Sequence, residues 1–168
     1  MTKEGLGHVL EVKPGFCALL ATGKVGYKKQ LFILPDDLLN VVKHLDECGY
    51  ALENITALEI EEGFLLVYHF NQWNNGEKLA LKVLLTDGVK EIDSISDVYP
   101  GALWHERECF DFFGIVFKNH SNLIPLLLDP KENIHPLLKA KNKRQPLAAI
   151  MPESEKIEQY IKIEELGK

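Results

Sequence analysis

The chain has 168 residues, of which 46% are apolar and 26% are charged, and its formal net charge at pH 7 is −6. This composition is ordinary for a globular protein, and it excludes wholesale disorder. The acidic balance gives no general attraction to nucleic acid or to an anionic membrane surface. We therefore expect no nucleic-acid partner. No apolar run approaches the roughly 18 residues of a membrane-spanning helix, so we also expect no direct membrane insertion.

The sequence also predicts the compartment. Three cysteines are far apart and odd in number, which is typical of reduced thiols in a cytosolic chain. The N-terminal residues lack the basic start, apolar stretch and small-residue cleavage site of a secretory signal. We therefore expect a soluble protein of the cytoplasm.

The first predicted elements are a strand and a helix. Residues 31–34 form a short apolar run, which residues 35–37 (Pro-Asp-Asp) end while offering a helix N-cap. Apolar side chains then recur at the helical spacing i, i+3, i+4 and i+7. They are Leu38, Val41, Val42 and Leu45. Gly49 is placed to end this helix. The earlier apolar run at 16–20 fits a strand or a helix.

The middle of the chain predicts three strands, at residues 55–60, 64–70 and 78–85. Each has apolar residues at alternating positions, and the third carries Lys82 on its less apolar face. Short turn signals separate them, and Asn-Gly at 75–76 is the strongest of these. The three segments therefore predict an antiparallel meander.

A second helix is predicted from about Pro100 to Phe113, where proline suits the first position and Gly114 ends the pattern. Beyond Phe117 the composition changes, because five of the eight prolines follow this residue. Prolines at this spacing block long helices. The same stretch is too apolar for a free tail, so either it packs over its own domain or another chain covers it. Near the C-terminus, residues 157–161 carry a weak helical stripe.

These elements predict an α+β fold. It consists of an antiparallel sheet (a meander) with helices packed on one face, in two layers, plus an extended proline-rich C-terminal arm. The expected organisation is an α+β domain at 1–117, followed at 118–168 by an arm and tail that dock on a partner subunit.

Charged and aromatic residues alternate in the segment 104–113, Trp-His-Glu-Arg-Glu-Cys-Phe-Asp-Phe-Phe. On a helix, Arg107 and Asp111 are i, i+4 neighbours and can pair. A solvated helix with weak surface ion pairs is one interpretation. The four aromatic residues leave little of the helix for water, which favours the other interpretation, a buried helix with its ions paired across an interface.

A metal site is a remote alternative for the same helix. His105 and Cys109 share a face at i, i+4, a spacing that helical metal ligands use. A structural site normally needs four ligands, and the others would have to come from His120 or His135. The cysteines are too far apart in sequence for an iron–sulfur cluster.

Enzymatic chemistry is not visible in the sequence. Cys109 lies among acidic residues, which disfavour the thiolate that a cysteine nucleophile needs. No phosphate-binding glycine loop or dinucleotide fingerprint is present. A small hydrolase or isomerase that uses Glu106 or Glu108 as general base is a further alternative, and it requires a carboxylate in a concave pocket.

The residues around this helix resemble a known family. Residues 94–100 and 104–115, followed by Phe117 and the segment 120–123, resemble the signature of the C subunit of the proton-pumping NADH:quinone oxidoreductases (respiratory complex I). The pattern is Glu-Arg-Glu, then Asp, then Gly, then an aromatic residue and a histidine before an apolar arm. The residues that carry or adjoin it are Trp104, Glu106, Arg107, Glu108, Asp111, Gly114, Phe117, His120, His135 and Pro136.

The resemblance implies a non-catalytic subunit of the hydrophilic arm that docks the quinone-site large subunit near the iron–sulfur relay. It implies that the signature residues serve assembly, and that this chain binds no cofactor, metal or catalytic group of its own. Iron–sulfur clusters, and flavin or nickel–iron, would lie on partner subunits. The chain would lie peripherally on the cytoplasmic side of the inner membrane.

The chain departs from the family pattern after residue 137. Members usually have Arg-Lys-Asp there, and this chain has Leu138-Lys139-Ala140. This departure gives weight to an alternative, the equivalent subunit of an energy-converting nickel–iron hydrogenase or formate hydrogenlyase-type complex, with a hydrogenase-like large subunit as partner.

Overall fold

The computed structural model describes residues 12–20, 26–86, 88–132, 134–150 and 157–166. Its main feature is a mixed six-stranded sheet with strand order β3-β4-β5-β2-β1-β8. In that order the strands are β3 (Tyr50–Ile60), β4 (Gly63–Gln72), β5 (Glu77–Thr86), β2 (Lys29–Ile33), β1 (Phe16–Leu20) and β8 (Ile157–Lys162). The α+β class predicted from the sequence is confirmed.

The predicted meander is confirmed as β3, β4 and β5, which pair antiparallel along their lengths. The sheet extends beyond it, because β2 pairs with β5 in parallel. The helix α2 (Leu38–Glu47) carries the chain back across the sheet after β2, so that β3 starts at the same end as β2. Two antiparallel hairpins later, β5 again runs in the direction of β2.

The C-terminal helical stripe is a wrong prediction, because the residues concerned form β8, which pairs antiparallel with β1. An isolated helix of this length is marginal in water, whereas the edge of β1 offers ready-made backbone partners. The ambiguous run at 16–20 is β1 itself. The 3-10 helix η4 (Ile163–Glu165) then places Ile163 in the main core.

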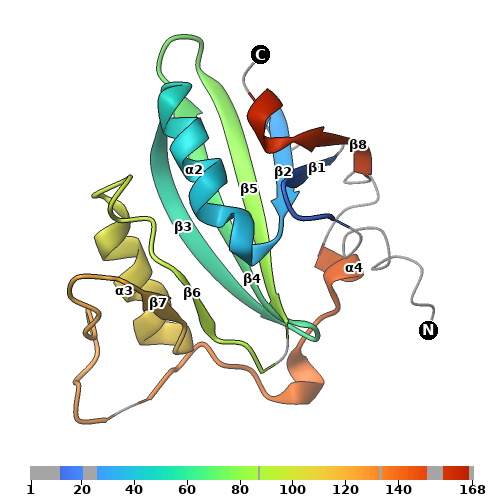
Figure 1. The fold of residues 1–168 in the computed structure, drawn as a ribbon. Coiled ribbons are helices and arrows are strands. Elements are labelled where there is room, and N and C mark those ends of the chain that lie inside the picture. Colours follow the sequence, from blue (N-terminus) through green and yellow to red (C-terminus); the bar gives the residue numbers. More distant parts are fainter. Residues whose placement is uncertain (1–11, 21–25, 87, 133, 151–156, 167–168) are drawn as a thin grey trace.

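Both long helices, α2 and α3 (Ala102–Phe113), lie on the same face of the sheet (Figure 1). The predicted stripe of α2 is confirmed, since Leu38, Val41, Val42 and Leu45 are all buried. Gly49 follows the helix with φ +78°, a left-handed conformation that suits glycine. Asp37 is the N-cap residue of α2, as predicted, and it closes a 3-10 helix, η2 (Pro35–Asp37), that precedes α2. Its buried carboxylate does not cap the helix, because it accepts the N–H of Gly15.

The helix α3 connects two short strands, β6 (Glu91–Asp93) and β7 (Val116–Lys118), which pair with each other in parallel. After β7 the chain runs in an extended path around α3 and past the end of the sheet (Figure 1). Along this path lie the 3-10 helix η3 (Lys141–Lys143) and the short helix α4 (Leu147–Ile150). Leu147 joins a smaller apolar cluster on the second face of the sheet. No helix in the described part of the chain is long and apolar enough to cross a membrane.

Candidate partner interface

Asp111 lies near the end of α3 and is only 2% exposed. Its Oδ2 accepts three backbone N–H groups, from Leu126 at 3.1 Å, Leu127 at 2.8 Å and Leu128 at 3.1 Å. Hydrogen bonds to an ionised acceptor are about twice as strong as neutral ones. One carboxylate oxygen therefore fixes three consecutive peptide groups of the arm.

Arg107 lies one turn earlier on the same face of α3 and binds the adjoining peptides. Its Nε donates to the carbonyl of Ile124 at 3.0 Å and its Nη2 to that of Pro125 at 2.8 Å. The predicted pairing of Arg107 with Asp111 is therefore wrong, because each side chain binds arm backbone. Together they hold residues 124–128, the clamped loop, through five hydrogen bonds.

The clamp uses the backbone of this loop and leaves apolar side chains outside. Leu127 is 71% exposed and Ile124 is 50% exposed. Trp104 is 63% exposed, and its ring centroid lies 5.3 Å from the guanidinium of Arg107, which also binds the Ile124 carbonyl. We call Trp104, Ile124 and Leu127 the docking patch, since exposed large apolar side chains around one anchor are typical of an interaction site.

Glu106 faces the opposite way, into the protein, and has no solvent exposure. Its two oxygens accept the hydroxyl of Ser94 at 2.6 Å and the N–H of Ile95 at 2.8 Å. Burial raises the pKa of this carboxyl to about 7, and the nearby charge of Asp97 acts in the same direction, whereas both hydrogen bonds lower the pKa. Glu106 thus ties α3 to the turn after β6.

His120 ties the beginning of the arm to the first turn of α3. Its Nδ1 accepts the N–H of Asn122 at 3.0 Å, so the ring proton lies on Nε2. That Nε2–H donates to the carbonyl of Leu103 at 3.1 Å and lies 3.9 Å from Glu106.

His135 packs against the C-terminal end of α3. Its Nδ1 donates to the carbonyl of Asp111 at 2.9 Å, and its ring meets Phe110 edge-on. Gly114 ends the helix at φ +71°, and a Cβ there would lie 2.8 Å from the His135 ring. Glycine is therefore needed at this position for two reasons: the left-handed backbone conformation and the lack of space for a Cβ beside the His135 ring. Pro136, the next residue, is exposed.

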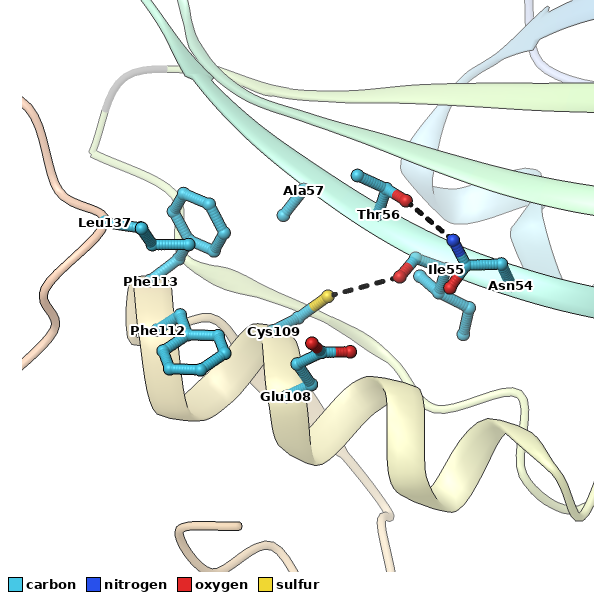
Figure 2. A pocket seen from close by; sticks show the side chains of 9 residues that line it. All are labelled: Asn54, Ile55, Thr56, Ala57, Glu108, Cys109, Phe112, Phe113 and Leu137. Atoms are coloured by element: carbon cyan, nitrogen blue, oxygen red, sulfur yellow. Dashed lines mark hydrogen bonds between the residues drawn. The ribbon is translucent and has the colours of Figure 1, made fainter. Parts of the chain in front are cut away.

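The remaining signature residues differ in surroundings. Phe117 of β7 is buried in the main core. Glu108 is exposed, and no described residue pairs with it. Figure 2 shows it beside Cys109, whose thiol points to the carbonyl of Ile55 on β3 at 3.9 Å.

A second anchor of the arm was missed from the sequence. Glu59 at the end of β3 is 3% exposed, accepts the N–H of Lys139 and pairs with Arg144 at 2.6 Å. The neighbouring Glu62 accepts the N–H of Leu147 at 2.9 Å. The available signal was the position of Glu59, since an acidic residue shares the strand face of the buried apolar residues 55 and 57.

The described residues show no arrangement for a metal. They contain no group of three or more His, Cys, Asp or Glu side chains placed to hold an ion. His120 and His135, the further ligands that the metal hypothesis needed, bind backbone groups instead. Burial raises the pKa of the Cys109 thiol to about 12, which disfavours the thiolate that binds metals.

An α+β domain whose short charged helix holds an extended arm is thus defined, and comparison with known proteins places it in the complex I class. Residues 31–146 match the family model described as the 30 kDa subunit of respiratory-chain NADH dehydrogenase. The match covers more than half of the chain. The chain therefore belongs to this family, and the resemblance given by the signature residues is confirmed.

Named relatives agree. The C subunit of the NADH-quinone oxidoreductase of Citrifermentans bemidjiense is 34% identical over 78% of this chain and 85% of its own length. That of Roseiflexus castenholzii is 33% identical over 73% of this chain and 74% of its own length. The C/D subunit of the Shewanella woodyi enzyme is 45% identical over 46% of this chain, a match that spans only 13% of that longer protein.

Two solved structures share the fold. A trypsin-resistant fragment of Nqo5 superposes with a TM-score of 0.56 over 62% of this chain and 88% of the fragment. A chain of the membrane-bound sulfane sulfur reductase, an archaeal respiratory membrane complex, superposes with a TM-score of 0.64 over 88% of both chains. Each is 22% identical to this protein.

Proposed function

We propose that this chain is a structural subunit, without an active site of its own, in the hydrophilic arm of a complex I-type NADH:quinone oxidoreductase. It holds the quinone-site large subunit against the iron–sulfur subunits, on the cytoplasmic side of the membrane. The observation that carries the proposal is the clamped loop, whose backbone is fixed to α3 while Ile124 and Leu127 face outward.

The clamp favours docking for an energetic reason. Ordering one backbone residue costs about 1–2 kcal/mol, a cost that a binding partner must otherwise supply. Here Arg107 and Asp111 order residues 124–128 within the isolated chain. Apolar side chains on an already rigid loop give most of their burial energy to association.

The equivalent subunit of a hydrogenase-type complex remains the second candidate. The observation that favours it is the sequence 138–140, Leu-Lys-Ala, in place of the Arg-Lys-Asp usual in the family. In either complex the redox groups, iron–sulfur clusters with flavin or with nickel–iron, belong to other subunits.

The test is affinity isolation of the full chain, expressed at native level in its own cells, in mild detergent. We expect a large subunit and iron–sulfur subunits to co-purify with the wild-type chain. Replacing Leu127 with serine should reduce their recovery at least about tenfold, as for a central interface residue. Trp73→Ser is the matched control, because Trp73 is 82% exposed in the β4–β5 turn, away from the arm.

The subunits that are recovered distinguish the two candidate complexes, and the two variants test the docking role. Flavin-type NADH-oxidising subunits in the sample favour the complex I assignment, and a nickel–iron large subunit without them favours the hydrogenase type. Equal recovery with Leu127→Ser and Trp73→Ser contradicts the docking role of the clamped loop. Absence of any partner contradicts the proposed function as a whole.

A further inference from the structure

The strand β3 forms one edge of the sheet, and its register shows which backbone groups face outward. A two-residue turn closes on the pair Ile60 and Gly63, which exchange hydrogen bonds as the last pair of such a hairpin. Alternation along the strand then turns the N–H and C=O groups of residues 55, 57 and 59 away from β4. Two contacts agree with this assignment: Cys109 lies against the carbonyl of Ile55, and the next outward N–H, of Glu61, donates to Gln145 at 3.0 Å.

A cavity of about 190 Å³ lies between this edge and α3 (Figure 2). Residues 54–57 form its strand wall, Glu108, Cys109 and Phe112 lie along its helix wall, and Leu137 of the arm lies at one end. Within the described chain, nothing bonds to the outward N–H and C=O of Ala57. The carbonyl of Ile55 has only the long contact with the Cys109 thiol.

The chemistry of this groove selects its occupant. Outward strand groups bind the backbone of an extended segment, as in β-strand addition. A helix is about 10 Å across with its side chains and does not fit into a cavity of about 190 Å³. Glu108 offers an unpaired carboxylate for a cationic side chain, and Phe112 with Leu137 offers an apolar contact. The segment that fits is therefore extended and carries a basic and an apolar residue.

A second copy of this chain fits less well. Pairing of β3 with itself about a two-fold axis would bring like surfaces together. It would bring the unpaired Glu108 carboxylates of the two copies onto the same edge. Like charges that face each other across strands are destabilising. The groove also adjoins the arm, because the N–H of Leu137 donates to the carbonyl of Phe112 at 3.2 Å.

We propose that an extended segment of a partner subunit adds to β3 as an extra strand in this groove, with its backbone on Ile55 and Ala57. A lysine or arginine of that segment pairs with Glu108, and an apolar residue packs against Phe112 and Leu137. This inference rests on the proposed function, and it adds a second interface beside the docking patch.

The test places a photo-crosslinking residue, p-benzoylphenylalanine, at position 108 of the full chain. The complex is isolated from cells and irradiated, and the crosslinked peptides are sequenced by mass spectrometry. We expect one partner segment with a basic residue and no helical periodicity. The matched control is position 164, also an exposed glutamate, on η4 beside the opposite sheet edge.

Charge reversal supplies the second measurement. Glu108→Lys should lower partner recovery about threefold to tenfold, because it removes one exposed ion pair and adds repulsion in its place. Glu164→Lys should change recovery less than about twofold. Ala57→Pro should act in the same direction, since proline removes the outward N–H of this edge strand. Because Ala57 is buried, its ring also adds atoms in the core. Melting curves of the isolated variants separate lost binding from lost folding.

The outcomes separate this inference from the function on which it rests. If partners co-purify but position 108 crosslinks to none of them, to a helix, or to a second copy of this chain, the groove proposal falls and the docking subunit stands. If no partner co-purifies, both fall.

Discussion

Glu106 is a carboxyl group without solvent contact, and its burial sets a pH dependence for the whole fold. Its pKa is about 7 in the folded protein against an ordinary value of 4.5. Between these pH values the folded chain binds more protons than the unfolded chain, so the free energy of unfolding falls as pH rises through this window. The stabilisation is fully present below about pH 4.5 and lost above about pH 7.

Glu106→Gln removes this titration. We expect the stability of the variant, relative to wild type, to rise by on the order of 1–3 kcal/mol between pH 5 and pH 8. Urea unfolding of both proteins at several pH values measures it. Glu108→Gln serves as control because Glu108 is exposed. A difference between wild type and Glu106→Gln that stays constant over this range contradicts the assignment.

Asp111 is the only described acceptor for three consecutive amides, so its removal should release the clamped loop and leave the domain folded. A buried N–H without a partner costs about 1–3 kcal/mol, and the loop avoids this cost by leaving α3. In Asp111→Ala we expect amide exchange at residues 126–128 to accelerate at least about tenfold. Asp129→Ala, which removes one exposed turn contact, is the control. Unchanged exchange at 126–128 argues against the clamp.

At the scale of elements, the end of α3 is fixed by the meeting of Gly114 with His135. Gly114→Ala introduces a Cβ at φ +71° and 2.8 Å from the imidazole. A left-handed conformation costs a residue with a Cβ about 1–2 kcal/mol, and the clash adds to it. We expect the melting temperature to fall by about 3–8 °C.

Gly101→Ala, at the other end of the same helix, is the matched control. Gly101 has ordinary helical dihedral angles, and nothing lies within 4 Å of an added Cβ. Differential scanning calorimetry of the two variants measures the contrast. Equal melting temperatures would show that His135 yields without cost and that the glycine is not needed there.

The elements also show how far local patterns predict this fold. The stripe of α2 and the alternation of β3 to β5 are periodic, so sequence alone predicts them correctly. The parallel pairing of β2 with β5 joins strands that are 50 residues apart in register, and no local turn signal encodes it. The tail forms β8 because β1 has a free edge, which is a tertiary cause.

The same limit applies to the candidate site. Helical spacing places Arg107 and Asp111 on one face, and that part of the prediction holds. Their partners are main-chain groups that follow 15 to 18 residues later, and a main-chain group has no residue type for a pattern to detect. The ion pair of Arg144 with Glu59 joins two side chains across a still longer separation, and no local spacing connects the two positions.

At the scale of the whole molecule, replacing each of two arginines distinguishes an effect on assembly from an effect on folding. Among the described residues, Arg107 binds only the clamped loop and the Trp104 ring, so its loss should leave the sheet intact. Arg144 pairs with Glu59, which is 3% exposed, and removing one partner of a buried pair costs about 3–5 kcal/mol. Arg107→Ala should therefore reduce partner recovery at least about tenfold with a melting temperature within about 3 °C of wild type.

Arg144→Ala should show the opposite pattern. Its main effect should be a large fall in the melting temperature of the isolated chain, which is seen without any partner. Melting curves of the purified variants and affinity isolation from cells measure both quantities on the same pair. If Arg107→Ala unfolds as readily as Arg144→Ala while its partners are still recovered, the clamped loop stabilises the domain and has no part in docking. If the order is as expected, Arg107 and the clamped loop serve assembly, and the fold of the domain does not depend on that loop.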